Sequence, residues 1–207
     1  MPTWVVALIS VGAGFFLGTF REIVKERKAR RKRWAFARRI LAHHATTLIE
    51  DADEFLRLAE ENRGASDTDL AARFCDAKTH ERGYIDQVKS HLEDLSDELI
   101  DLLRDLDSAS AEAATWVAIV QRASAQLFEK MSAMQSYAVG MSLREQFDHA
   151  EKTHREMRAI ALRVLEQLSD EHAALPQRSR DALALARNAG QLTEGGRRQL
   201  AKSSGSD

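Results

Sequence analysis

The N-terminal part of the chain joins an uncharged apolar run directly to a strongly basic one. Residues 3–20 contain no charged side chain, whereas residues 21–39 hold ten lysines and arginines and two glutamates. As a helix, the eighteen residues of the apolar run span roughly 27 Å, close to the ~30 Å hydrocarbon core of a bilayer. We therefore predict a transmembrane helix over residues 1–20 and a basic juxtamembrane helix over residues 21–39. The basic residues that we single out are Lys25, Arg27, Lys28, Arg30, Arg31, Lys32, Arg33, Arg38 and Arg39.

The order of apolar and basic residues predicts an orientation. A cleaved signal peptide carries positive charge before its apolar region, but here the charge follows it, and the first three residues have no charged side chain. Because lysine and arginine remain on the cytoplasmic side, we expect the N-terminus outside and the bulk of the chain in the cytoplasm. Arginine outnumbers lysine 22 to 8, as in GC-rich bacterial genomes, so the expected location is a bacterial inner membrane, crossed once. The alternative, a buried core helix, does not account for the sharp charge asymmetry.

Small residues recur within the predicted membrane helix. Ser10, Gly14 and Gly18 are spaced four residues apart and therefore share one stripe. Such a stripe lets two membrane helices pack closely, although glycine is also common in membrane helices generally. Dimerisation through this stripe is a hypothesis that stands beside the simpler one that the glycines have no packing role.

The rest of the chain has the pattern of a helical bundle. Only two prolines occur in 207 residues, and no stretch shows the alternation expected of strands. We predict an all-α protein, in which a long antiparallel, coiled-coil-like bundle of three or four helices over residues 34–175 follows the transmembrane helix. Turn signals near Gly64, at "DLDSASAE" and at Gly140 predict helices over about 34–62, 67–107, 110–140 and 142–172. One kinked helix from about 110 to 172 is the alternative, and residues 176–207 are predicted to form a short helix and a flexible tail.

The clearest apolar pattern lies in the second of these predicted helices. Its apolar residues follow alternating steps of three and four, which is the pattern of a coiled-coil seam. The seam consists of Ile85, Val88, Leu92, Leu95, Leu99, Leu102 and Leu106.

An acidic block accompanies this seam. Residues 93–107 contain seven acidic residues and one arginine, whereas residues 25–39 contain nine basic residues and one acid. An antiparallel turn at Gly64 brings the two blocks together and places Lys25 near Asp105, so we expect them to pair. The acidic counterpart consists of Glu93, Asp94, Asp97, Glu98, Asp101 and Asp105. Basic charge left over is expected to attract anionic lipid headgroups, and nucleic acid ranks last as a partner because the net charge of the chain is −2.

The sequence offers little for catalysis. Glu151 and His154 form a Glu-x-x-His pair, which di-iron bundles use twice, but no second copy occurs. A surface glutamate and a hydrogen-bonded core histidine are therefore the preferred interpretation, with no catalytic residue, metal or cofactor assigned. The single cysteine, Cys75, has no partner at a zinc-ligand spacing.

These patterns favour an interaction protein over an enzyme. We expect a membrane-anchored helical scaffold or adaptor that binds a protein partner or a second copy of itself at the cytoplasmic face. A membrane-perturbing protein of the holin or toxin type is the alternative, and a di-iron four-helix-bundle enzyme is the lesser one.

Overall fold

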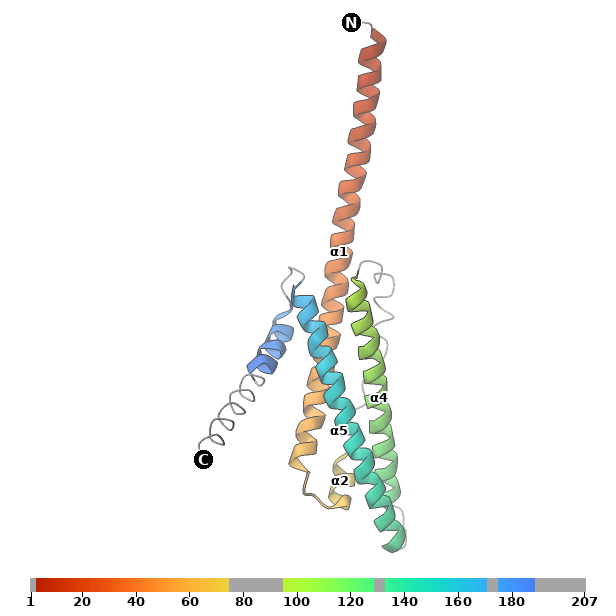
Figure 1. Cartoon of the computed structure of the whole chain (residues 1–207), viewed down its shortest axis with the longest axis vertical. Helices are drawn as coiled ribbons and strands as arrows, with labels where there is room; N and C mark the ends of the chain where they lie inside the picture. The colour runs from red at the N-terminus through yellow and green to blue at the C-terminus, as the bar shows by residue number, and fades with distance from the viewer. Residues whose placement is uncertain (1–2, 75–94, 129–132, 171–174, 189–207) are drawn as a thin grey trace, which may run out of the picture.

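The computed structural model describes residues 3–74, 95–128, 133–170 and 175–188, and it describes side chains from residue 20 onward, except those of 128–141 and 170 within the described helices. The elements are α1 (Thr3–Glu61), α2 (Asp67–Phe74), α4 (Asp97–Phe128) and α5 (Ala133–Asp170), together with a helix over residues 177–188. These five helices pack as a bundle (Figure 1), which confirms the predicted all-α class.

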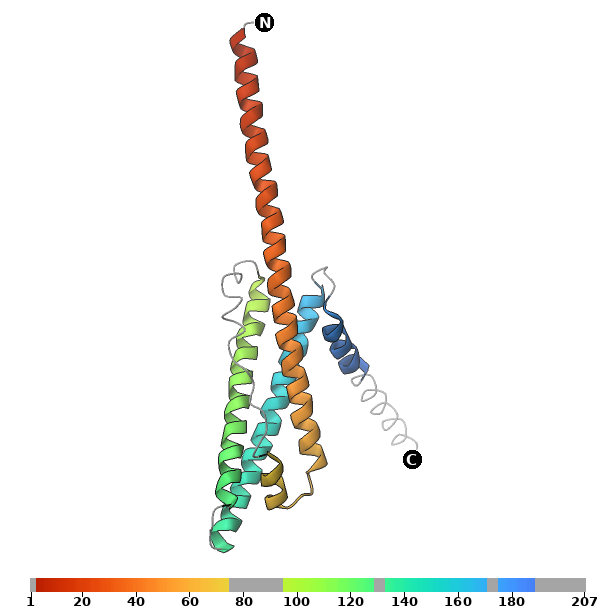
Figure 2. The same ribbon diagram turned by 180° about the vertical axis from the view of Figure 1, so that it is seen from behind.

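α5 is the central element of the bundle. It packs along both α4 and α1, and the short α2 fits against α4 and α5 at one end. α1 and α4 run in the same direction, whereas α5 runs antiparallel to both (Figures 1 and 2). The N-terminal part of α1 extends well beyond the other described helices in both views, so α1 belongs to the bundle only in its C-terminal half.

The core divides into two clusters of buried side chains. The first lies at the end of the bundle from which α1 projects, and includes Leu41 and Leu48 of α1, Leu99 of α4 and Leu165 of α5. The second lies near the α1–α2 turn and is built around Phe55, Phe74 and Phe147. The α1 residues of the first cluster recur at helical steps of three and four, which is why one face of this long helix is buried.

The predicted transmembrane segment falls largely outside the described side chains. Residues 3–19 belong to the helical backbone of α1, but the structure describes no side chain before Phe20. Among the residues that the structure describes fully, no helix is both long and apolar enough to cross a bilayer. The membrane helix over residues 1–20 thus remains a prediction.

The structure describes four of the seven predicted seam residues, and three of these four are buried. Leu95, Leu99 and Leu106 are buried, whereas Ile85, Val88 and Leu92 lie outside the described residues. Leu102 is only half-buried, and its neighbour Leu103 is buried instead. α4 contacts α2 as well as α5, so its apolar face is broader than a two-helix seam.

Two predicted helix ends do not form. α4 continues without interruption through residues 107–110, because a serine in a helix interior costs only about half a kcal/mol relative to alanine. α5 likewise passes through Gly140 and Ser142, so neither the hairpin at Gly140 nor the N-terminal cap at Ser142 exists. A helical glycine costs about 1 kcal/mol, which the burial of a single α5 residue such as Leu143 offsets. The single kinked helix from 110 to 172 is not observed either, since α4 and α5 run antiparallel to each other (Figures 1 and 2).

Substitutions at Ser108 distinguish a continuous α4 from a helix start. Ser108 is exposed within α4, so Ser108→Ala should stabilise the protein by about 0.5 kcal/mol and Ser108→Gly should destabilise it by a similar amount. At an N-cap the order reverses, because alanine is then worse than glycine. Thermal unfolding of the three full-length proteins in detergent, followed by circular dichroism, measures this order.

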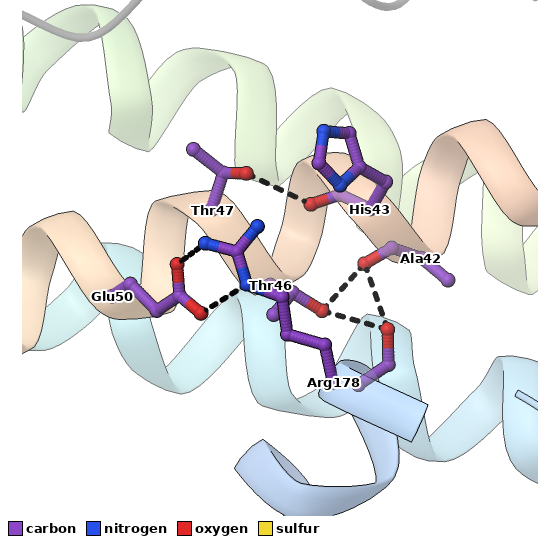
Figure 3. Close-up of polar contacts among 7 residues, drawn as sticks. Ala42, His43, Thr46, Thr47, Glu50 and Arg178 are labelled. Carbon is purple, nitrogen blue, oxygen red and sulfur yellow. Dashed lines mark hydrogen bonds and ion pairs between the residues drawn. The ribbon is translucent and has the colours of Figure 1, made fainter. Parts of the chain in front are cut away.

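The helix over residues 177–188 docks on α1 through a polar contact and two leucines. The Thr46 hydroxyl oxygen lies 2.7 Å from the Ala42 carbonyl oxygen and 2.8 Å from the hydroxyl oxygen of Ser179. Beside it, the Arg178 guanidinium makes a two-pronged ion pair with Glu50, one arm of which measures 2.6 Å (Figure 3). This hydrogen bond and the charge of Glu50 raise the pKa of Arg178. Leu175 and Leu183 join the first core cluster, so this predicted short helix is part of the bundle.

Candidate functional site

The candidate site is the basic stalk, which we define as residues 21–33 of α1. This stretch of helix stands clear of the other described helices (Figures 1 and 2), and all its basic side chains are exposed. Further along α1, Arg38 is only 5% exposed where the helix enters the bundle, whereas Arg39 is exposed. The predicted basic helix of residues 21–39 therefore divides into a solvent-facing stalk and a bundle entrance.

Four side chains at the lower end of the basic stalk converge on one face. Arg27, Arg30, Arg31 and Trp34 line a common open hollow of about 430 Å³. Their spacing of three, four and seven residues places them on the same side of a helix. Trp34 also packs against the first core cluster, so this hollow begins where the bundle core ends. The guanidinium groups and the indole ring form a cationic and aromatic surface, which suits an anionic partner.

The described residues of the predicted acidic counterpart are not brought against the basic stalk. Glu93 and Asp94 lie outside the described residues. Asp97, Glu98, Asp101 and Asp105 are exposed on the first turns of α4, and Asp101 pairs within α4 with Arg104 at 3.2 Å.

The predicted match of Lys25 with Asp105 fails because of helix direction, whereas the part of the pairing that involves Glu93 and Asp94 stays a prediction. An antiparallel match requires a helix that runs back along α1 from the Gly64 turn through residue 107, but Leu95 and Ser96 are not helical and α4 begins afresh at Asp97. α4 starts at the end of the bundle from which α1 projects and runs parallel to α1 (Figures 1 and 2). Lys25 in the basic stalk and Asp105 in the bundle are consequently far apart along the fold.

Glu151 and His154 do not face a shared metal position. The His154 ring stacks on Phe55 with 3.9 Å between ring centroids, and its Nδ1 lies 2.6 Å from the Ala150 carbonyl oxygen. The Glu151 carboxylate pairs with Arg155 at 2.5 Å and with Arg63 at 3.6 Å. Within the described part of the chain, no three His, Cys, Asp or Glu side chains group closely enough to hold a metal ion.

A second hollow, which the sequence did not indicate, lies at the α1–α2 turn. It measures about 380 Å³, and its lining includes Asn62, Arg63, Arg144 and Glu151. Arg144 pairs with Asp67 at 2.6 Å and donates to the Ala65 carbonyl oxygen at 3.1 Å. The arginines of this hollow thus form ion pairs with carboxylates of the same chain. These ion pairs connect the α1–α2 turn to α5.

The small-residue stripe of Ser10, Gly14 and Gly18 lies in the part of α1 without described side chains, so its packing role stays a prediction. No family model, curated protein or solved structure matches this chain. The site is therefore interpreted from its own geometry and chemistry.

The helical phase of the basic residues is a sequence signal for this site. Grouping all of residues 21–39 as one basic segment does not use that signal. Arg27, Arg30 and Arg31 continue the spacing of Trp34 and Leu41 upward from the bundle, and an unbroken helix keeps that phase. Sorting the basic residues by helical face, and not only by charge, would have identified the surface.

Proposed function

We propose that this protein is a membrane-anchored helical scaffold or adaptor that acts by protein–protein interaction at the cytoplasmic face of an inner membrane. One observation carries the proposal: the apolar run, the basic stalk and one wall of the bundle all belong to a single uninterrupted helix, α1. The apolar segment lies on the part of α1 that extends beyond the other described helices (Figures 1 and 2), where it is available to the bilayer.

The length of the basic stalk supports a role as a spacer. Trp34 lies fourteen positions after Phe20, which corresponds to about 21 Å of helix. The headgroup layer is only about 5–8 Å thick on each side of a bilayer. The first turn of the stalk thus contacts anionic headgroups, which attract about 1 kcal/mol per lysine or arginine, and the bundle is held in the aqueous phase.

Deletion of residues 3–20 tests the anchor. The full-length chain should remain in the membrane pellet after an alkaline carbonate wash, whereas the deleted chain should move to the supernatant because it has lost its apolar segment. An alkaline phosphatase domain fused to the C-terminus should be inactive, since positive charge keeps that end in the cytoplasm. Carbonate-resistant retention of the deleted chain, or an active fusion, contradicts the proposal.

The same pair of proteins addresses the membrane-perturbing alternative. A scaffold should be tolerated on induced expression with or without residues 3–20. Growth arrest and dye entry that require residues 3–20 would instead identify a protein that permeabilises the bilayer.

A further inference from the structure

The hollow at the α1–α2 turn combines an apolar lining with charged groups of both signs. It lies at the end of α1 away from the projecting stalk (Figures 1 and 2). The apolar part of its lining includes the buried side chains of Leu70 of α2 and Phe147 of α5. Its volume of about 380 Å³ falls within the usual range of small-molecule sites. The charged residues of the lining are two arginines and two carboxylates, namely Arg63, Arg144, Asp148 and Glu151.

Two oxygen acceptors in this lining have no partner among the described residues. Asn62 is only 5% exposed. Its amide nitrogen donates to the Leu58 carbonyl oxygen at 2.7 Å, which leaves its Oδ1 atom as an acceptor toward the hollow. Asp148, also in the lining, makes no ion pair within the described part of the chain. Because a nearly buried amide oxygen is stabilised by a hydrogen bond, this wall favours a ligand that donates, and the carboxylate favours a positively charged one.

The two arginines supply the opposite chemistry. Arg144 uses its Nε atom for Asp67 and its Nη2 atom for the Ala65 carbonyl oxygen. The ion pairs of Arg63 with carboxylates of its own chain both use its Nη2 atom. A guanidinium group carries five N–H donors, so each arginine retains donors for a further carboxylate. The side chains of Arg144 and Arg63 are 55% and 61% exposed, so a ligand can reach them.

We propose that this hollow binds a free α-amino acid with an apolar side chain. The ammonium group of the ligand donates to the Asn62 amide oxygen and to Asp148. The carboxylate of the ligand accepts from the remaining N–H groups of Arg63 and Arg144, and its side chain packs on Phe147. The inference goes beyond the proposed function, because the site is built from the bundle and does not require the membrane anchor.

Ligands with a single kind of charge fit this lining less well. An anion bound by the arginines would also meet Asp148 and Glu151, whereas a simple amine would meet both arginines. Metal ions are disfavoured too, since no three His, Cys, Asp or Glu side chains group together within the described residues. A zwitterion satisfies both halves of the lining, which carries two charges of each sign.

A set of amino-acid derivatives tests the three contacts separately. The apolar L-amino acids are titrated by calorimetry into the full-length protein in nanodiscs of neutral phosphatidylcholine. The tightest binder is then compared with its N-acetyl derivative, which lacks the ammonium group, with its amide, which lacks the carboxylate, and with glycine, which lacks the apolar side chain. The amino acid should bind about tenfold or more tightly than each of these, because each lacks one class of contact. Absence of binding by every apolar amino acid, or equal binding of the derivatives, overturns the proposal.

Asp148→Asn removes the carboxylate that is assigned to the ammonium group. Asp148 is exposed, so the variant should fold, and it should weaken binding of the amino acid about tenfold, because a charge-assisted hydrogen bond is lost. Binding of the N-acetyl derivative should not change. Glu145→Gln makes the same change in charge at an exposed position of α5 outside the hollow and should leave affinity within about twofold. Equal losses in the two variants would indicate a non-specific effect of charge and overturn the assignment.

Arg63→Gln should give the reciprocal pattern. It removes a guanidinium group assigned to the carboxylate of the ligand, so it should weaken binding of the amino acid and leave binding of the amide derivative unchanged. A variant that weakens both equally would show that Arg63 does not contact the carboxylate.

Hydrogen–deuterium exchange locates the bound amino acid. Amides of residues 62–70 should gain protection in its presence, because the ligand connects the α1–α2 turn to α5, whereas amides of residues 178–188 should not change. Protection confined to other parts of the chain overturns the site. A chain without residues 3–20 should bind with the same affinity. If that chain binds and the anchor test fails, the site stands alone, whereas an anchored chain that binds no apolar amino acid leaves the anchor and rejects the site.

Discussion

Phe74→Ala should lower the free energy of unfolding by about 3–5 kcal/mol, the usual cost of truncating a fully buried phenylalanine. Phe74 has no exposed surface. Its ring meets Phe147 edge-on at a centroid distance of 4.6 Å and Phe55 at 5.4 Å. Together with Leu70 and Ala71 it forms the buried face of α2, so its truncation also loosens the packing of this helix against α4 and α5. Urea unfolding of the full-length protein in detergent, followed by circular dichroism, measures the loss.

Arg73→Ala is the matched control for this substitution. Arg73 precedes Phe74 in α2 and is exposed, so its truncation should change stability by no more than about 0.5 kcal/mol. A loss of less than about 1 kcal/mol for Phe74→Ala would mean that the aromatic cluster of Phe55, Phe74 and Phe147 does not hold α2 in place.

Local periodicity predicted the helical class and much of the core. The apolar steps through Leu41 and Leu48 of α1 and through Leu99 and Leu106 of α4 identify side chains that are buried. This works because the burial of one helix face depends on the spacing of its own residues, whichever helix covers it. For the same reason, helical phase is sufficient to place Arg27, Arg30 and Arg31 on one face with Trp34.

Helix order and direction were not predictable in the same way. The match between the acidic and basic blocks is a property of the sequence, but whether the blocks meet depends on the path of the chain between α2 and α4. α5 packs extensively against both α4 and α1. Because it runs antiparallel to each of them, α1 and α4 run in the same direction. Exposed ion pairs contribute only about 0–1 kcal/mol each, so Asp97 and its acidic neighbours do not outweigh that apolar packing.

Turn signals misled for a related reason. Gly140 and the serines at 108 and 110 favour a break only slightly, whereas α4 and α5 each bury many side chains along one face. A signal worth a fraction of a kcal/mol ends a helix only where packing does not oppose it. Gly64 is such a place, because a Cβ added there would meet nothing within 4 Å and the chain does turn between Glu61 and Asp67.

Ser179→Asp should release the helix over residues 177–188 from the bundle. Ser179 is 1% exposed. Its hydroxyl group contacts the Thr46 hydroxyl group and the Ala42 carbonyl oxygen. The carbonyl oxygen can only accept hydrogen bonds. Thr46 offers a single proton. A carboxylate there would be buried without adequate pairing, at a cost of several kcal/mol. That cost is comparable to the free energy gained by burying Leu175 and Leu183. The burial of each leucine stabilises the docked helix by about 1.5–3 kcal/mol.

Hydrogen–deuterium exchange distinguishes release of this helix from global unfolding. In Ser179→Asp, amides of residues 178–188 should lose protection, whereas those of α5 around Leu165 should keep it. Ser179→Ala removes about 1 kcal/mol of hydrogen bonding and should leave the helix docked. Ala184→Asp adds the same charge at an exposed position of the same helix and should also leave it docked. If the aspartate at 179 preserves protection, the docking of this helix does not depend on the Thr46–Ser179 contact, and the leucines alone hold it.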